Sequence, residues 1–178
     1  MEVKIYKQME AFMKKMSTKY LIRVSISVIL LILLDQLTKI WAVVRLKDQP
    51  AISLIRGVFE LQYLENRGSA FGMMQGARVF FIISTIVLFL LVCVIYIRIP
   101  KEKMYLPLRV IAVLFLAGAA GNFIDRVRQG FVVDFFYFSL INFPIFNVAD
   151  IYVTTATIAL IVFILFYYKE ADLERIFS

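Results

Sequence analysis

The sequence predicts a mainly α-helical integral membrane protein with four transmembrane helices, and two observations lead to this fold class. Of the 178 residues, 62% are hydrophobic, whereas soluble domains are usually 45–50% apolar. The chain also contains four apolar runs, each close to the ~20 residues that a helix needs to cross the hydrocarbon core. No polar linker divides the chain, so residues 1–178 are interpreted as one membrane domain. The predicted spans are residues 20–44, 79–97, 104–124 and 151–168.

The first span follows a basic segment, residues 1–19, whose apolar side chains recur at helical spacing. This pattern favours a cytoplasmic amphipathic leader at the membrane interface, although a loosely ordered tail would fit as well. A cleaved signal peptide is the competing interpretation of the first span. No small-residue cleavage site follows it, because "IWAVVRL" is bulky, so the span is interpreted as permanent.

The other three spans differ in charge. No charged residue occurs in residues 79–97 or 151–168, whereas Arg109 lies near the start of residues 104–124. Positive residues gather before the first span and between the second and third, which predicts cytoplasmic N- and C-termini. The segment 45–78 is also basic, although it should lie on the outer side, so the positive residues are not confined to the predicted cytoplasmic side. Gly118 and Gly121 should let the third span approach a neighbouring helix closely.

Two segments should then lie outside the membrane on its outer face. Residues 45–78 are long enough to fold, and "VFELQYL" alternates apolar and polar residues as a half-buried strand does. The stretch "ENRGSAFG" follows it as a turn. Residues 125–149 form the second external loop, and the aromatic density of "FFYFSLINFPIF" is typical of a segment at the membrane interface.

Composition limits the possible chemistry. The net charge is +7, but the basic residues flank apolar runs, which favours anionic lipid headgroups over nucleic acid. There is no histidine and only one cysteine, Cys93. An intramolecular disulfide, a histidine-activated nucleophile and a histidine-ligated zinc site are therefore excluded. Acid–base chemistry must come from Asp, Glu, Lys or Tyr.

Two aspartates stand at the outer ends of apolar runs. Asp125 follows the third span and Asp150 precedes the fourth, and each comes three residues after an asparagine, Asn122 or Asn147. The two spans run in opposite directions, so both acids should lie at the same depth. Two carboxyls that meet in a low-dielectric site share one proton. The ionised one can take a proton from water while the protonated one polarises a scissile carbonyl.

Simpler roles exist for the same two acids. Asp125 beside Arg126 could form an ion pair at the interface, and Asp150 could stabilise the start of a helix through its dipole.

A third acid, Asp35, lies four residues before Lys39 within the first span, so the two share a helix face. An ion pair between them that braces the external segment is the favoured interpretation. A serine–lysine dyad of Lys39 with Ser69 is the alternative, but nothing in the sequence brings those residues together.

Two other classes of protein share some of these features. Acids within the membrane also mark ion pathways, so a small transporter or a proton-relay subunit is possible. Such a protein needs polar residues along its full depth, whereas the second and fourth spans have few beyond Ser84, Thr85 and three threonines near one end. A structural scaffold would leave the paired Asn–Asp motifs unexplained.

Four motifs occur in order along the chain. They are "DQLTK" (35–39), "NRGSAFG" (66–72), "GNFIDRVRQGFVVDF" (121–135) and "FNVAD" (146–150). In these motifs, and over most of its length, the sequence resembles the lipoprotein signal peptidases, or type II signal peptidases.

This resemblance implies an aspartic endopeptidase of the bacterial cytoplasmic membrane that needs no metal or cofactor. It would remove the signal peptide from diacylglyceryl-modified prolipoproteins, cleaving just before the lipidated cysteine near the outer face. Membrane lipids and cyclic-peptide inhibitors such as globomycin are the other implied ligands. The segment 45–78 would form a small extracytoplasmic β-sheet cradle with a short interfacial helix.

The resemblance also implies roles for individual residues. The catalytic pair would be Asp125 and Asp150. The residues that position the substrate and the acids would be Asn66, Gly68, Asn122, Arg126 and Asn147. The polar positions with a structural role would be Asp35, Lys39 and Asp134.

Overall fold

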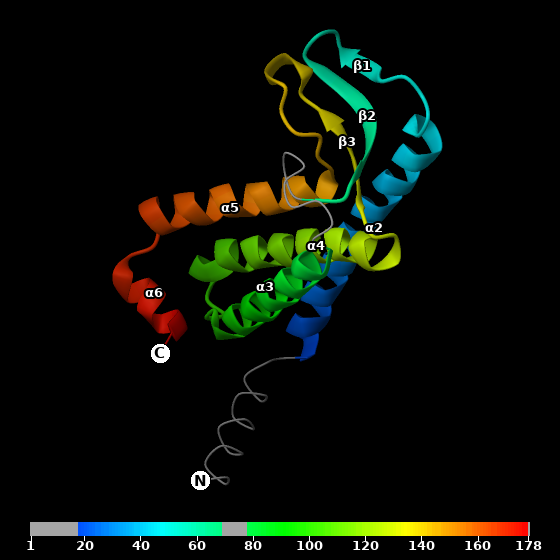
Figure 1. Ribbon diagram of the computed structural model, residues 1–178. Coiled ribbons are helices and arrows are strands. Elements are labelled where there is room, and N and C mark those ends of the chain that lie inside the picture. Colours follow the sequence, from blue (N-terminus) through cyan, green and yellow to red (C-terminus); the bar gives the residue numbers. More distant parts are fainter. Residues whose placement is uncertain (1–17, 69–77, 178) are drawn as a thin grey trace.

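The computed structural model describes residues 18–68 and 78–177, and these form long helices and one small sheet (Figure 1). Four of the helices are long and apolar enough to cross a membrane. They are α2 (Thr18–Leu46), α3 (Arg78–Arg98), α4 (Leu106–Arg128) and α5 (Val148–Phe166). The predicted fold class, four membrane helices with a small sheet, is confirmed.

The helix ends differ from the predicted ones by a few residues, and one difference matters for the site. The sequence placed the end of the third span at residue 124, before the first acid, but α4 continues to Arg128. Asp125 therefore lies inside a helix rather than in the external loop. Likewise α5 begins at Val148, which puts Asp150 in its first turn.

The sheet has three antiparallel strands in the order β1 (Ile52–Ile55), β2 (Phe59–Asn66) and β3 (Val132–Tyr137). The strand predicted at "VFELQYL" corresponds to β2. Gly57, with a φ of +71°, lies in the turn between β1 and β2, where a residue with a Cβ would be strained. β3 was not predicted, because its first four residues are all buried and so do not alternate in polarity.

The sheet covers the end of the helix bundle at which α2 finishes and α5 starts (Figure 1). Ala42 and Leu46 of α2 are buried together with Leu61, Val133 and Phe135 of the sheet. Because these contacts join residues far apart in the sequence, they fix the position of β3 relative to the ends of the helices.

Helix α4 packs against α2, α3 and α5, and two glycines make this possible. A Cβ atom added at Gly118 would lie 2.6 Å from the carbonyl oxygen of Ala149, and one at Gly121 would lie 2.5 Å from Oδ2 of Asp35. Both distances are shorter than any real contact. The prediction that these small residues allow close helix packing is confirmed.

A last helix, α6 (Glu170–Phe177), was not predicted from the sequence; it folds back beside the turn between α3 and α4 (Figure 1). Tyr105 donates a hydrogen bond to the carbonyl of Asp172 (2.9 Å), and Tyr168 donates one to that of Met104 (2.8 Å). Two 3₁₀ turns complete the described elements, η2 (Lys103–Tyr105) and η3 (Ser139–Ile141).

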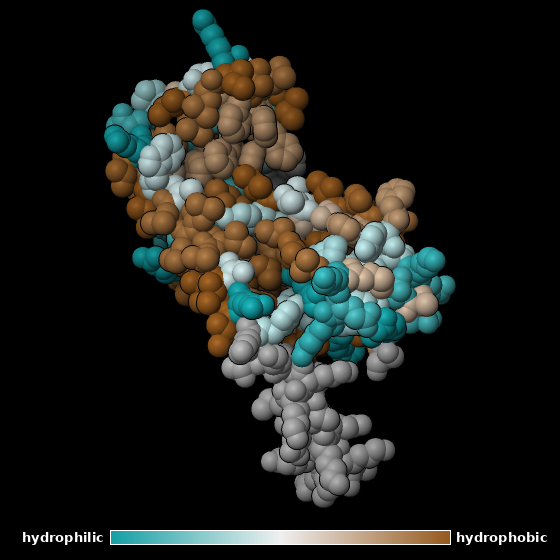
Figure 2. Space-filling model, turned by 180° about the vertical axis from the view of Figure 1, so that it is seen from behind, coloured by the Kyte–Doolittle hydropathy of each residue, from teal (hydrophilic) through white to brown (hydrophobic). Residues whose placement is uncertain are grey.

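The surface has the pattern expected in a membrane. Figure 2 shows hydrophobic residues across the helices and hydrophilic residues gathered at the end that carries α6. The exposed aliphatic side chains of the helices include Leu37, Val44, Val79 and Ile158. Two predictions, the leader at 1–19 and the short interfacial helix within 45–78, fall mostly on residues 1–17 and 69–77, which lie outside the described residues.

Candidate active site

The first of two buried polar clusters surrounds Lys39. Its Nζ lies 2.9 Å from Oδ2 of Asp35 and 2.9 Å from Oδ2 of Asp125, and none of the three side chains is more than 6% exposed. Asp35 also accepts a hydrogen bond from the backbone N–H of Ala149 (2.9 Å), and Gln36 donates one to Asp125 (3.1 Å). The cluster therefore ties α2 to α4 and to the start of α5. The expected pairing of Asp35 with Lys39 is present.

The second cluster contains Asp134, on β3, and Asp150, on α5. Asn147 contacts both carboxylates: its Nδ2 donates to Oδ1 of Asp134 (2.6 Å), and its backbone N–H donates to Oδ2 of Asp150 (3.1 Å). The side-chain oxygen of Asn147 in turn accepts from the backbone N–H of Asp150 (3.0 Å), which completes a capping box at the start of α5. One asparagine thus holds the two acids beside each other.

Other residues of the second cluster hold the remaining carboxylate oxygens. Asn66 donates to Oδ2 of Asp134 (2.8 Å), and Asn122 donates to Oδ1 of Asp150 (2.8 Å). Asn122 also accepts a hydrogen bond from Lys39 (2.9 Å), so it links the two clusters.

Arg126 lies beside this second cluster. Its Nη2 donates to the carbonyl of Gly68 (3.3 Å), and its guanidinium lies over the ring of Phe81, 4.9 Å from the centroid. The structure thus gathers all five residues for which a positioning role was expected: Asn66, Gly68, Asn122, Arg126 and Asn147.

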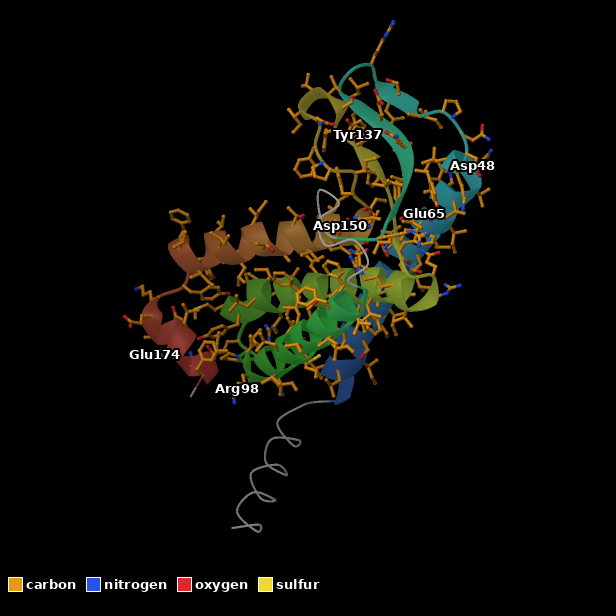
Figure 3. All side chains as sticks on the ribbon, viewed as in Figure 1. Asp48, Glu65, Arg98, Tyr137, Asp150 and Glu174 are labelled. Atoms are coloured by element: carbon orange, nitrogen blue, oxygen red, sulfur yellow. The ribbon has the colours of Figure 1, made fainter. Side chains whose placement is uncertain are left out.

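A cavity of about 570 Å³ opens onto the second cluster. Asp134 and Asp150 both line it, and Figure 3 shows Asp150 at the start of α5, beneath the sheet. The other polar lining residues are Asn66, Asn122, Arg126, Thr154 and Thr155. The apolar lining residues are Val132, Phe138, Ile141, Phe143, Pro144, Ile145, Phe146 and Ile151. An acid pair therefore faces a mostly apolar space.

Asp125, the expected partner of Asp150, does not line the cavity of about 570 Å³. It lines a separate cavity of about 280 Å³ together with Lys39. Among the described residues, Asp125 and Asp150 share no hydrogen-bond partner. Asp125 is held by Gln36 and Lys39 of α2. Asn122, one turn earlier on α4, also contacts Lys39 but reaches Asp150 of α5 as well. The acid that lies beside Asp150 is Asp134, for which only a structural role was expected.

The surroundings of Asp134 raise its pKa to about 7, first through burial and then through the negative charge of Asp150. The hydrogen bonds from Asn66 and Asn147 act in the opposite direction. The raised pKa favours the protonated form of this carboxyl, which is the state that the proton donor of a shared-proton acid pair requires.

No metal site emerges from residues 18–68 and 78–177, because nowhere in those ranges do three or more His, Cys, Asp or Glu side chains form a group able to hold a metal ion. The cluster of Asp134 and Asp150 instead offers a proton donor and a proton acceptor in one apolar cavity. Fold and site together define a class: a membrane-embedded hydrolase of the aspartic type.

Comparison with known proteins gives the family. The family described as signal peptidase (SPase) II matches residues 27–166. The chain is 44% identical over 144 residues to a lipoprotein signal peptidase of Clostridioides difficile (strain 630), covering 81% of this chain and 95% of that protein. A second one, from Clostridium tetani (strain Massachusetts / E88), is 42% identical over 158 residues, covering 86% and 98%.

Two solved structures of bacterial membrane enzymes have a similar fold. One is 30% identical with a TM-score of 0.71, covering 83% of this chain and 92% of that one. The other is 31% identical with the same TM-score, covering 82% and 94%. The chain belongs to the signal peptidase II family and is a peptidase of the aspartic type, so the resemblance in its four motifs is confirmed.

Proposed function

We propose that the protein cleaves diacylglyceryl-modified prolipoproteins just before the lipidated cysteine, and that Asp134 and Asp150 activate the attacking water. Membership of the family supports the broader activity, removal of signal peptides from prolipoproteins. One observation carries the choice of acids: Asp134 and Asp150 line the same cavity and share Asn147 as a hydrogen-bond partner.

In the proposed mechanism Asp150 is the base. Its carboxylate accepts hydrogen bonds from Asn122 and from the backbone of Asn147 at the start of α5. Both bonds favour the ionised form and act against the burial of this carboxyl, which disfavours the charge. Asp150 takes a proton from water as the water oxygen attacks the scissile carbonyl. Asp134 gives its proton to the carbonyl oxygen, which forms a neutral tetrahedral intermediate.

The intermediate then collapses with the same two groups in reversed roles. Asp134 takes the proton of one hydroxyl as the carbonyl re-forms, and Asp150 gives its proton to the leaving amine of the cysteine. The C–N bond breaks, and both acids return to their starting protonation states. The acid pair thus needs no further proton donor or acceptor to complete one turnover.

Arg126 has a supporting role in this proposal. Its planar guanidinium already holds the carbonyl of Gly68 at the edge of the cavity. A fork of donors in that position suits a second backbone carbonyl, that of the substrate. The same arrangement would align the peptide bond with the two acids.

Lipidation of the substrate fits the apolar part of the cavity. A signal peptide in a membrane can slide along the bilayer normal, so its scissile bond has no fixed depth. Acyl chains bound against Ile141, Phe143 and Ile151 would fix that depth, contributing about 0.8 kcal/mol for each buried CH₂. Globomycin, a cyclic peptide, is proposed to occupy the same cavity.

The proposed orientation has both termini in the cytoplasm and the sheet at the outer face of the bacterial cytoplasmic membrane. It is supported by the positive residues Arg98, Lys101 and Lys103 at the turn between α3 and α4, the end of the bundle away from the sheet.

The test compares one prolipoprotein with and without its diacylglyceryl group, at equal concentration in the same detergent. Cleavage is followed by gel shift and the new N-terminus is read by mass spectrometry. Rapid cleavage of the lipidated form only, immediately before its cysteine, is expected. Comparable cleavage of the unlipidated form would contradict the role given to the acyl chains.

A further inference from the structure

Two threonines, Thr154 and Thr155, line the cavity one turn beyond Asp150 along α5. Thr154 follows Asp150 by four residues, so it lies on the same helix face about 6 Å farther into the bilayer. The side chains of both threonines are exposed to the cavity rather than packed against a neighbouring helix. Neither takes part in the proposed proton transfers.

Most of the other serine and threonine hydroxyls in the described membrane helices bond to a carbonyl of their own helix, whereas those of Thr154 and Thr155 do not. A threonine or serine in a membrane helix commonly bonds its hydroxyl to the carbonyl four residues earlier. Thr157 does so with Val153 (2.8 Å) and Thr85 with Phe81 (2.7 Å). Within the described part of the chain, the hydroxyls of Thr154 and Thr155 have no such partner.

An unsatisfied donor is costly when the mostly apolar part of the cavity is filled by acyl chains, because these offer it no acceptor. The partner should therefore be a polar group that arrives within the otherwise apolar cavity. A diacylglyceryl cysteine has such groups: its two ester carbonyls lie a few single bonds beyond the sulfur, between the scissile peptide bond and the acyl chains. With the scissile bond at Asp134 and Asp150, the esters would reach the next helical turn.

We infer that Thr154 and Thr155 recognise the glyceryl ester carbonyls of the lipidated cysteine by donating hydrogen bonds to them. They are specificity-determining residues, since the acids cleave the bond and the threonines read the ester linkage. This inference rests on the proposed function, because it needs the lipidated cysteine to lie in the cavity of about 570 Å³.

The experiment measures the cleavage kinetics of each enzyme variant with each of two substrates. The variants are Thr154→Val, Thr155→Val and their double variant, in which a methyl group replaces each hydroxyl at nearly constant volume. Thr157→Val is the matched control, because its hydroxyl already bonds within the helix and does not line the cavity. One prolipoprotein is prepared with a diacylglyceryl group and with a dialkyl ether analogue, which has the same chains but no ester carbonyl.

The expected result is a rise in KM for the ester substrate of about three- to tenfold for each single variant, the range of one hydrogen bond, with little change in kcat. The ether substrate should already have a raised KM with the wild-type enzyme and should respond to none of these variants. Thr157→Val should match the wild type with both substrates.

Two other outcomes are distinguishable. Equal losses with ester and ether substrates would overturn the inference, because the hydroxyls would then contact the peptide, and unchanged kinetics in the double variant would overturn it as well. If the wild-type enzyme cleaves neither lipidated substrate, the proposed function itself fails, and this is visible before any threonine variant is compared.

Discussion

Replacing Lys39 by methionine should strongly destabilise the protein, because it leaves two buried acids without their cation. The Nζ of Lys39 lies 2.9 Å from both Asp35 and Asp125, and all three side chains are almost fully buried. Methionine has a similar length and fills the space, so the packing changes little. The expected loss is therefore electrostatic.

The size of this loss follows from the burial of the cluster. Breaking a buried ion pair by removing one partner costs about 3–5 kcal/mol, because the remaining charge is uncompensated. For a chain of this length, such a loss corresponds to a fall in Tm on the order of 10 °C. Adding Asp125→Asn to the variant removes one of the two stranded charges and should restore part of the loss.

The assay is thermal unfolding in detergent, with Lys47→Met as the control. Lys47 also pairs with an acid, Glu65, at 3.2 Å, but its side chain is 44% exposed. An exposed pair contributes about 0–1 kcal/mol, so Lys47→Met should unfold within a few degrees of the wild type. A Lys39→Met protein that unfolds at the wild-type temperature would refute the view that this cluster ties α2 to α4.

Three further predictions concern the site and the packing beneath it. Because the pKa of Asp134 is raised to about 7 in the folded state, stability should fall as the pH rises from about 4, the ordinary carboxyl pKa, to about 7, and should level off above that. Asp134→Asn should reduce this dependence in thermal unfolding scans. Gly118→Ala should cost about 1–3 kcal/mol in the same scans, because its Cβ would lie 2.6 Å from the backbone oxygen of Ala149, and a wild-type Tm would contradict that packing. Arg126→Lys should lower kcat/KM more than tenfold, since lysine lacks the planar fork, and wild-type kinetics would show that only the charge matters.

The sequence predicted the four spans because each is a long apolar run, and a run of about 20 apolar residues has few other stable solutions. It also predicted the close approach of α4 to its neighbours from Gly118 and Gly121. The same reasoning ended the third span at residue 124, before Asp125, since a charged residue commonly ends an apolar run. In the structure the helix continues, because Lys39 of α2 compensates that charge.

The acid that lies beside Asp150 was harder to predict from the sequence, because the depth of a residue in the membrane does not fix the direction in which its side chain points. Asp125 and Asn122 are one turn apart on α4 and both contact Lys39 of α2, yet only Asn122 also reaches Asp150 of α5. Which face meets which helix is decided by contacts between distant segments, such as Ala149 with Asp35. Asp134 lies in a strand whose first four residues are all buried, so no alternating pattern of polarity marks its position in the sequence.

The most direct test of the proposed acid pair is single-turnover cleavage of a lipidated prolipoprotein by purified Asp134→Asn and Asp150→Asn variants, with folding checked by thermal unfolding. Each substitution keeps the shape of the side chain and removes one half of the acid–base pair, so each should slow cleavage by at least about a hundredfold. The double variant should be little slower than either single one, because the two groups act as a unit. If Asp125 were the partner of Asp150 instead, Asp134→Asn would cleave at close to the wild-type rate, and that result would contradict the account.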